Sequence, residues 1–417
     1  MNARTPIGRV GILLAVSLVV SLLVYARSLD NGFRNDDFAH LGHAATGSPP
    51  ECIFHPGPEF AFYRPGAILL FLIEHHLFGL ESGWYILFNY LIHVSIAGLL
   101  IGLLHALGFE RGVAVLAGSL FLVGAGHYGK TVMWASCGGT LFAGLLSLFA
   151  LTLAVRWART LKESVSVAFP RGWAPAAWAF AVLLAAPFFH ESAIVAAPLA
   201  ICILAMFGRC PWKSKIICAG VMIFAALLPA DVFLALRSRY PAYSVPLNII
   251  PIAARAAVRH LGFTVVPLQP SVIADRAPAA VGLLARHVLP VHFAVGSAVL
   301  LAAVAWILSP LRRKRFVGIW LVLALAPFML VPMPENYLEL RYVYNASLPL
   351  SAFAAAAVFA ALRSRRRTAR IAGLTMLAYA IIVSVALTMI LEKKYDASGR
   401  EPGNIERLEE IRALSPS

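Results

Sequence analysis

Residues 10–26 read VGILLAVSLVVSLLVYA, and residues 29–41 read LDNGFRNDDFAHL. The first segment is uncharged and about as long as a helix must be to cross a hydrocarbon core of about 30 Å. The second segment is polar, contains a glycine turn and places two adjacent aspartates before a predicted helix start. The chain therefore opens with a predicted membrane-spanning helix that leads into a loop with paired carboxylates.

Ten more apolar runs of similar length follow, so the sequence predicts an all-α, polytopic transmembrane protein with about 11 spans. Of the 417 residues, 60% are apolar and 13% are charged, which excludes an ordinary soluble globule and a disordered chain. The predicted spans are approximately residues 10–26, 84–107, 112–126, 131–155, 174–189, 192–208, 216–236, 288–308, 316–333, 343–362 and 371–391.

The formal net charge of +15 could indicate a nucleic-acid partner or a membrane topology, and the position of the charges decides between them. If the N-terminus is cytoplasmic, the cytoplasmic segments carry a formal charge of +17 and the rest of the chain carries −2. This asymmetry predicts a transmembrane domain over residues 1–391, with long outer loops at 27–83 and 237–287 and a short extracytoplasmic tail at 392–417. It leaves no support for nucleic-acid binding.

The first outer loop contains the residues with the clearest chemical potential. Asp36 and Asp37 precede a predicted helix, so either carboxylate could cap that helix or act as a general base near the membrane surface. Residues 65–79 form an apolar stretch too short for a span, and we predict a helix that lies at the outer interface. Asn89 and His93 share one face of the next helix, where polar side chains typically bond neighbouring helices.

Several motifs lie at the outer ends of the predicted helices. They are NGFRNDDF at 31–38, YRP at 63–65, a turn at 127–140 that contains Trp134 and paired glycines, HES at 190–192, and ELRYVY at 339–344. Together these motifs resemble the GT-C superfamily of polytopic membrane glycosyltransferases. The sequence is most similar to the protein O-mannosyltransferase-related branch, which includes the transmembrane and tetratricopeptide repeat-containing proteins, although no repeat domain follows here.

The resemblance implies a GT-C-like fold and an inverting hexosyltransferase that takes a sugar from a polyprenyl-phosphate donor at the outer face of the membrane. Its acceptor would be a glycan, a lipid or a protein. The general base would be Asp37, the preferred residue, or Asp36. A guanidinium fork matches the oxygens of the leaving phosphate, so the phosphate-binding candidates are Arg341, Arg64 and Arg237. The substrate-binding candidates are His190, Glu191, Tyr342 and Trp134.

The resemblance implies no required cofactor. Asp36 and His40 would share a helix face, with His43 nearby, and these donors suit Mn or Zn, but the sequence contains no fixed ligand signature. The alternative function is a polytopic transporter or lipid flippase, which would place its polar residues near the bilayer midplane rather than at the outer ends of helices. The expected location is the bacterial inner (plasma) membrane, with the N-terminus cytoplasmic and the C-terminus extracytoplasmic.

Overall fold

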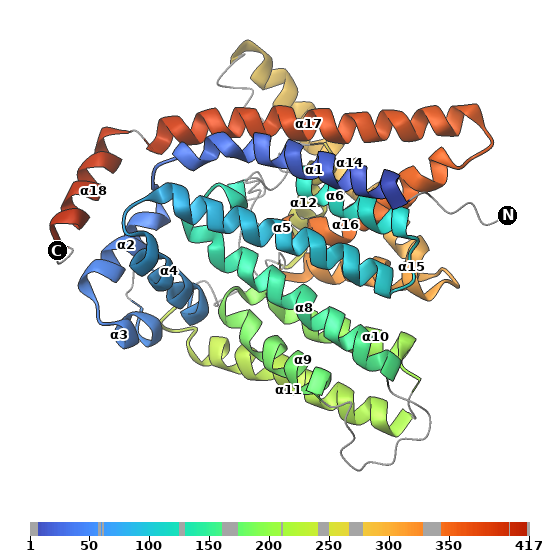
Figure 1. Cartoon of the computed structure of the whole chain (residues 1–417), viewed down its shortest axis with the longest axis horizontal. Coiled ribbons are helices and arrows are strands. Elements are labelled where there is room, and N and C mark those ends of the chain that lie inside the picture. Colours follow the sequence, from blue (N-terminus) through green and yellow to red (C-terminus); the bar gives the residue numbers. More distant parts are fainter. Residues whose placement is uncertain are drawn as a thin grey trace.

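The computed structural model describes residues 7–56, 60, 62–124, 130–160, 174–209, 212–240, 250–266, 278–327, 343–399 and 401–414. Within these ranges every regular element is a helix and no strand occurs, which confirms the predicted all-α class. The long helices run roughly side by side, as Figure 1 shows, so that their apolar residues pack against each other along most of their length.

Among the described residues, seven helical segments are long and apolar enough to cross a membrane. They correspond to α1 (Ile7–Ala26), α5 (Ser82–Ala106), α8 (Gly138–Thr160), α11 (Trp212–Ala235), α14 (Pro278–Ile307), α16 (Tyr344–Leu362) and α17 (Arg367–Gly399). The remaining four predicted spans coincide with the shorter helices α6 (Arg111–Val123), α9 (Ala174–Ala185), α10 (Ala196–Phe207) and α15 (Arg312–Leu325). The chain is therefore a multi-pass membrane protein, while the count of eleven spans stays a prediction.

One end of the bundle collects the short helices of the first predicted outer loop. These are α2 (Asp36–Thr46), α3 (Pro49–Phe54) and α4 (Pro65–Phe78), and the last helix, α18 (Pro402–Leu414), lies beside them. The first residues of α1 lie at the opposite end (Figure 1). α4 has the bounds of the predicted interfacial helix. α14 begins at Pro278, ten residues before the predicted span, and α17 continues to Gly399, beyond the predicted end at residue 391.

The basic connections that predicted the cytoplasmic side meet at the end opposite α2. Arg313 donates a hydrogen bond to the carbonyl oxygen of Gly108, and Arg312 donates one to that of Met206, at 2.6 and 2.8 Å respectively. Arg363 forms an ion pair with Glu110 at 2.5 Å. Connections that are far apart in the sequence therefore share one face of the bundle, as the charge pattern predicts for a single side of the membrane.

Buried polar side chains bond the central helices, as predicted for Asn89 and His93. The Asn89 amide donates to the carbonyl oxygen of Trp134 at 2.9 Å. His93 Nε2 lies 3.3 Å from the carbonyl oxygen of Leu122, which can only accept, so Nε2 carries the proton and Nδ1 accepts from the Tyr344 hydroxyl at 2.8 Å. These bonds join α5 to α6, to α16 and to the turn before α8, and this confirms the predicted bonding role.

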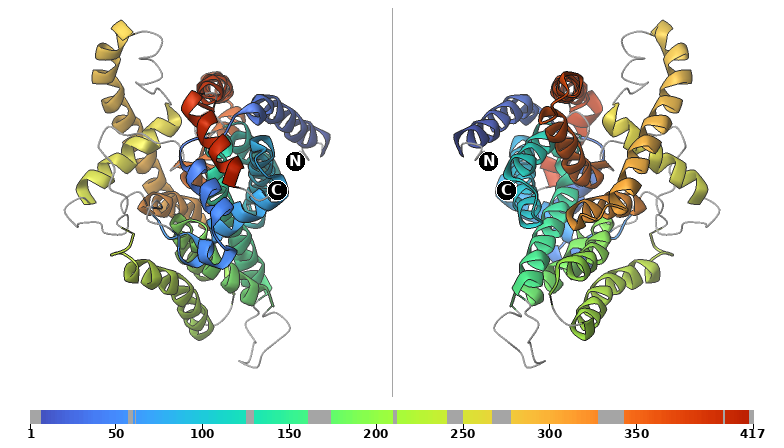
Figure 2. Two further views of the ribbon diagram at one scale, coloured as in Figure 1. Left: turned by 90° about the vertical axis from the view of Figure 1, so that its left-hand side faces the viewer. Right: turned by 90° about the vertical axis from the view of Figure 1, so that its right-hand side faces the viewer.

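Helices α12 (Ile250–Val265) and α14 cross closely at one flank of the bundle (Figure 2), and two glycines make this approach possible. A Cβ atom at Gly262 would overlap the carbonyl oxygen of His292, and one at Gly296 would overlap that of Val258. The two backbones are therefore in direct contact, with no space for a side chain between them.

We expect Gly262→Ala to lower the free energy of unfolding by about 1–3 kcal/mol, because the added methyl group forces the two backbones apart. The measurement is the midpoint of thermal unfolding of the purified protein. Gly220→Ala on α11 is the matched control, since a Cβ atom there meets nothing within 4 Å. Equal midpoints for the two variants would show that the crossing tolerates a methyl group.

Candidate functional site

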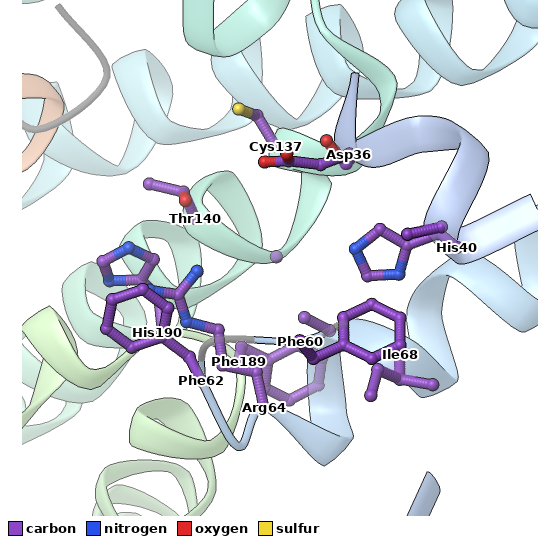
Figure 3. A pocket seen from close by; sticks show the side chains of 14 residues that line it. Asp36, His40, Phe60, Phe62, Arg64, Ile68, Cys137, Thr140, Phe189 and His190 are labelled. Carbon is purple, nitrogen blue, oxygen red and sulfur yellow. The ribbon is translucent and has the colours of Figure 1, made fainter. Parts of the chain in front are cut away.

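A pocket of ≈ 290 Å³ opens at the end of the bundle that carries α2. Its walls come from α2, from the segment that leads into α4, from the start of α8, and from the turn at residues 189–190. The polar lining residues are Asp36, His40, Arg64, Ser136, Cys137, Thr140 and His190. The apolar lining residues are Ala39, Phe60, Phe62, Ala67, Ile68, Gly139 and Phe189. Figure 3 shows Asp36 across the pocket from Arg64 and the phenylalanines, with His40 and His190 at its two ends.

The two adjacent aspartates have different surroundings. Asp36, at the first position of α2, is exposed and lines the pocket. Asp37 is only 1% exposed, and its two carboxylate oxygens accept backbone N–H groups from opposite directions. Oδ2 accepts from Arg34 at 3.0 Å, and Oδ1 accepts from Ser136 at 2.7 Å. Asp37 thus ties the start of α2 to the turn before α8, while Asp36 faces the space that a substrate could occupy.

The buried carboxyl groups behind the pocket hold their protons more tightly than usual. Burial raises the pKa of Asp37 to about 6, although the charge of Arg34 and the two backbone hydrogen bonds work in the opposite direction. Burial also raises the pKa of Glu74 on α4 well above its usual range, and the charge of Asp37 adds to the effect. Both carboxyl groups therefore keep their protons to a higher pH than an exposed carboxyl group does.

Arg64 and Glu191 form a two-point ion pair in the opposite wall. Arg64 Nε and Nη2 lie 2.8 and 2.6 Å from the two carboxylate oxygens, which is the geometry in which a guanidinium fork fits a carboxylate best. Burial alone would raise the pKa of Glu191, but the charge and hydrogen bonds of Arg64 outweigh it and hold that pKa at about 2. The guanidinium also lies 4.2 Å from the ring centroid of Phe62. The pair joins the segment before α4 to the 3-10 helix η4 (Glu191–Val195).

Hydrogen bonds fix the ring of His190. The backbone N–H of Ser192 donates to His190 Nδ1 at 3.2 Å, so Nδ1 is an acceptor and the proton of the neutral ring sits on Nε2. The Ser192 hydroxyl lies 2.8 Å from the same nitrogen, and the amide of Asn345 donates to that hydroxyl at 2.7 Å. The relay from α16 through Ser192 therefore fixes the ring of His190, which lines the pocket.

His40 is also neutral, because burial lowers its pKa to about 4. Its ring stacks on Phe71 at a centroid distance of 4.8 Å and lies 4.9 Å from the ring of Phe60. His43, the third donor of the metal site considered from the sequence, is hydrogen-bonded to the carbonyl oxygen of Cys52. Among the residues that the structure describes, no group of three or more His, Cys, Asp or Glu side chains is placed to hold a metal ion.

The structure brings some of the predicted site residues together and separates others. Asp36, Arg64 and His190 line one pocket, and Glu191 lies directly behind Arg64. Trp134 is buried beneath the pocket wall, with the Arg34 and Lys130 cations 5.3 and 4.9 Å from its ring centroid. Arg237 is exposed just beyond the end of α11 and does not line this pocket. Arg341 and Tyr342 lie outside the described residues.

Some lining residues were not predicted from the sequence. Ser136, Cys137 and Thr140 come from the turn and first helical residues after Trp134, and Phe60, Phe62 and Phe189 form the apolar wall. The motif around Trp134 predicted that this turn contributes to the site through Trp134. In the structure Trp134 lies in the core, and the small polar residues after it reach the pocket. No sequence signal distinguishes these three phenylalanines from the other 22 in the chain.

No protein-family model and no curated protein sequence matches this chain. Among solved structures, it is similar to the oligosaccharyltransferase AglB of Archaeoglobus fulgidus in complex with an inhibitory peptide and a dolichol-phosphate. That match has 14% identity and a TM-score of 0.52, and it covers 98% of this chain and 60% of that chain. The apo form of the same organism's oligosaccharyltransferase matches with 12% identity and a TM-score of 0.53, over 99% of this chain and 61% of that chain.

ArnT from Cupriavidus metallidurans, bound to undecaprenyl phosphate, matches with 15% identity over 99% of this chain and 77% of that chain, at a lower TM-score of 0.45. The chain spans about 60% of the length of the oligosaccharyltransferases it matches. At these identities the likeness concerns the fold. The helical bundle described above therefore shares the fold of these oligosaccharyltransferases.

Proposed function

We propose that this protein is an inverting membrane glycosyltransferase that transfers a sugar from a polyprenyl-phosphate donor to an acceptor hydroxyl at the outer face of the bacterial inner membrane. The observation that carries the proposal is the pocket. An exposed aspartate faces an arginine and a histidine at the membrane-surface end of a GT-C fold. The alternative of a transporter has less support, since the charged side chains of this site lie at one end of the bundle.

In the proposed reaction, a carboxylate oxygen of Asp36 removes the proton from the acceptor hydroxyl as that oxygen attacks the anomeric carbon. The bond between this carbon and the phosphate oxygen breaks on the opposite face, so the configuration inverts. Polyprenyl phosphate leaves with the bonding electron pair, and Asp36 holds the proton until solvent or the departing phosphate takes it. Asp36 is favoured over Asp37 as the base, because both oxygens of Asp37 already accept backbone N–H groups.

The leaving phosphate needs positive charge and hydrogen-bond donors. Arg64 lines the pocket, but one edge of its guanidinium is held by Glu191, so we propose that it orients the phosphate together with His190 Nε2. Arg341 and Arg237 remain the proposed sources of further positive charge. The donor enters from the outer leaflet, where its phosphate lies at headgroup depth, level with the outer ends of the helices.

A direct test uses the purified full-length chain in nanodiscs with a panel of polyprenyl-phosphate hexoses, mannose first because of the similarity to protein O-mannosyltransferases. Release of polyprenyl phosphate and the anomeric configuration of the product are measured. The proposal requires turnover with one of these donors and an inverted product. Movement of the lipid between leaflets of proteoliposomes without cleavage would instead establish a flippase.

We expect Ser192→Ala to lower kcat/KM for the donor by about 2- to 10-fold, because the ring of His190 loses one of the hydrogen bonds that hold it. The measurements are kcat and KM for the donor. Ser147→Ala is the control, since its hydroxyl bonds only to the Ala143 carbonyl oxygen one turn earlier in α8. Unchanged kcat/KM in Ser192→Ala would show that the relay from Asn345 has no part in the reaction.

A further inference from the structure

We infer that α18, the last helix of the chain, is a positioning element of the pocket: its Ile411 side chain wedges the start of α2 and the turn at residues 135–137 into place. This inference rests on the proposed function, since it concerns the position of the proposed base, Asp36. α18 lies more than 350 residues from Asp36 in the sequence but packs directly on α2 (Figure 1).

A small hydrophobic cluster, separate from the main core of the bundle, lies between α18 and the first predicted outer loop. Ile411 is 7% exposed and belongs to this cluster with Phe33, Phe38, Leu41, Phe71, Tyr85 and Ala135. Leu408, one turn earlier on α18, packs against it, and the guanidinium of Arg407 lies 6.0 Å from the ring centroid of Phe38. Thus a single face of α18 meets the first predicted outer loop.

The members of the cluster lie next to residues that line the pocket. Phe38 is two residues after Asp36 on α2, Ala135 immediately precedes Ser136, and the ring of Phe71 on α4 stacks with His40. The cluster therefore supports two walls of the pocket from behind, the one formed by α2 and the one formed by the turn at residues 135–137. α18 itself supplies no lining residue, so its effect on the reaction must act through α2 and its neighbours.

This arrangement explains why α2 needs support from α18. α2 has eleven residues, and an isolated helix of that length is marginally stable in water. Its contacts with the rest of the protein include the Asp37 hydrogen bond to Ser136 and the packing of Phe38 and Leu41, and Ile411 closes the cluster that holds these two apolar side chains. A displacement of Asp36 by about 1 Å would be enough to slow a reaction by about 100-fold.

The test compares Ile411→Asp with Ile405→Asp in the full-length protein. Both variants place a carboxylate on α18, but Ile405 is 49% exposed whereas Ile411 is buried. We expect Ile411→Asp to lower kcat by about 10- to 100-fold with KM for the lipid donor changed less than twofold, because the wall that carries Arg64 and His190 is untouched. Ile405→Asp should keep the wild-type kcat. Ile411→Leu, which keeps an apolar side chain of similar size at the buried position, should keep it as well.

Amide hydrogen exchange provides a second readout that does not depend on the reaction. Exchange over residues 33–45 should accelerate in Ile411→Asp and in the milder Ile411→Ala, which serves if the aspartate variant does not fold. Normal exchange over residues 33–45 in Ile411→Ala, or equal loss of kcat in Ile405→Asp and Ile411→Asp, would overturn the inference. If the wild-type protein transfers no sugar, the proposed function fails, and the exchange measurement still decides whether Ile411 holds α2.

Discussion

Replacement of Asp36 with asparagine is expected to lower the rate of sugar transfer by about 10²- to 10⁴-fold, the usual contribution of a general base. Asparagine keeps the shape of the side chain but cannot accept the hydroxyl proton. Because Asp36 is exposed at the first position of α2, the midpoint of thermal unfolding should stay close to that of the wild type. The measurement is release of polyprenyl phosphate under saturating donor, with the unfolding midpoint recorded on the same sample.

Asp37→Asn is the matched comparison, because it makes the same chemical change one residue away. An asparagine oxygen can accept one of the two backbone N–H groups that Asp37 now accepts, but the amide NH2 group would face the other. We therefore expect Asp37→Asn to lower both the unfolding midpoint and turnover. Two results together would instead identify Asp37 as the base. Asp36→Asn would keep its turnover, and kcat/KM of both the wild type and Asp36→Asn would decrease as the pH falls below about 6, the pKa of Asp37.

The fold was largely predictable because the membrane imposes a strong and simple pattern. A span such as residues 84–107 must be long and apolar, and α5 has nearly these bounds. The basic segments around Arg313 and Arg363 predicted which connections share a side, and their contacts with Gly108 and Glu110 agree. The prediction was less accurate at helix ends, as at Pro278, because the predicted span was taken to begin after Arg286 and His287, whereas a helix can continue through charged residues at the edge of the hydrocarbon region.

The site was harder to predict, because it depends on contacts between distant segments. The sequence indicated Asp36, Arg64 and His190 one at a time, and it allowed Glu191 either to bind substrate or to hold an arginine, but it did not identify Arg64 as that arginine. The sequence alone favoured Asp37, and our proposal of Asp36 rests on the hydrogen bond from the Ser136 N–H to Asp37, which comes from 99 residues away in sequence. Residues 392–417 were predicted as a short extracytoplasmic tail, and nothing in their sequence indicated that Ile411 packs beneath the first loop.

The second large effect is expected at the Arg64–Glu191 pair. Arg64→Ala should lower turnover by about 100-fold, because it removes a proposed phosphate ligand and releases the link between the segment before α4 and η4. It should also lower the free energy of unfolding by about 1–3 kcal/mol, since the Glu191 carboxylate loses its partner. This figure is below the usual value for a buried pair, because the two side chains remain 25% and 20% exposed.

The double variant Arg64→Ala/Glu191→Ala separates the structural effect from the catalytic one. Removing both partners takes away the uncompensated carboxylate, so the unfolding midpoint should recover most of the way to the wild type. Turnover should remain as low as in Arg64→Ala if the guanidinium contacts the donor phosphate. Recovery of turnover together with stability would show that Arg64 only holds Glu191 in place.

The pH dependence of stability gives an independent measure of the same pair. The pKa of Glu191 is held at about 2 in the folded protein, below its ordinary value of 4.5, so the folded state binds fewer protons than the unfolded state between these values. The stabilisation from the ionised carboxylate is therefore complete above pH 4.5 and is lost as the pH falls toward 2. Glu191→Gln has no carboxyl group to protonate at this position, so its free energy of unfolding should fall less than that of the wild type between pH 4.5 and 2. An identical acid profile for the two proteins would mean that the ion pair contributes nothing to stability, and Arg64 would then act on the substrate alone.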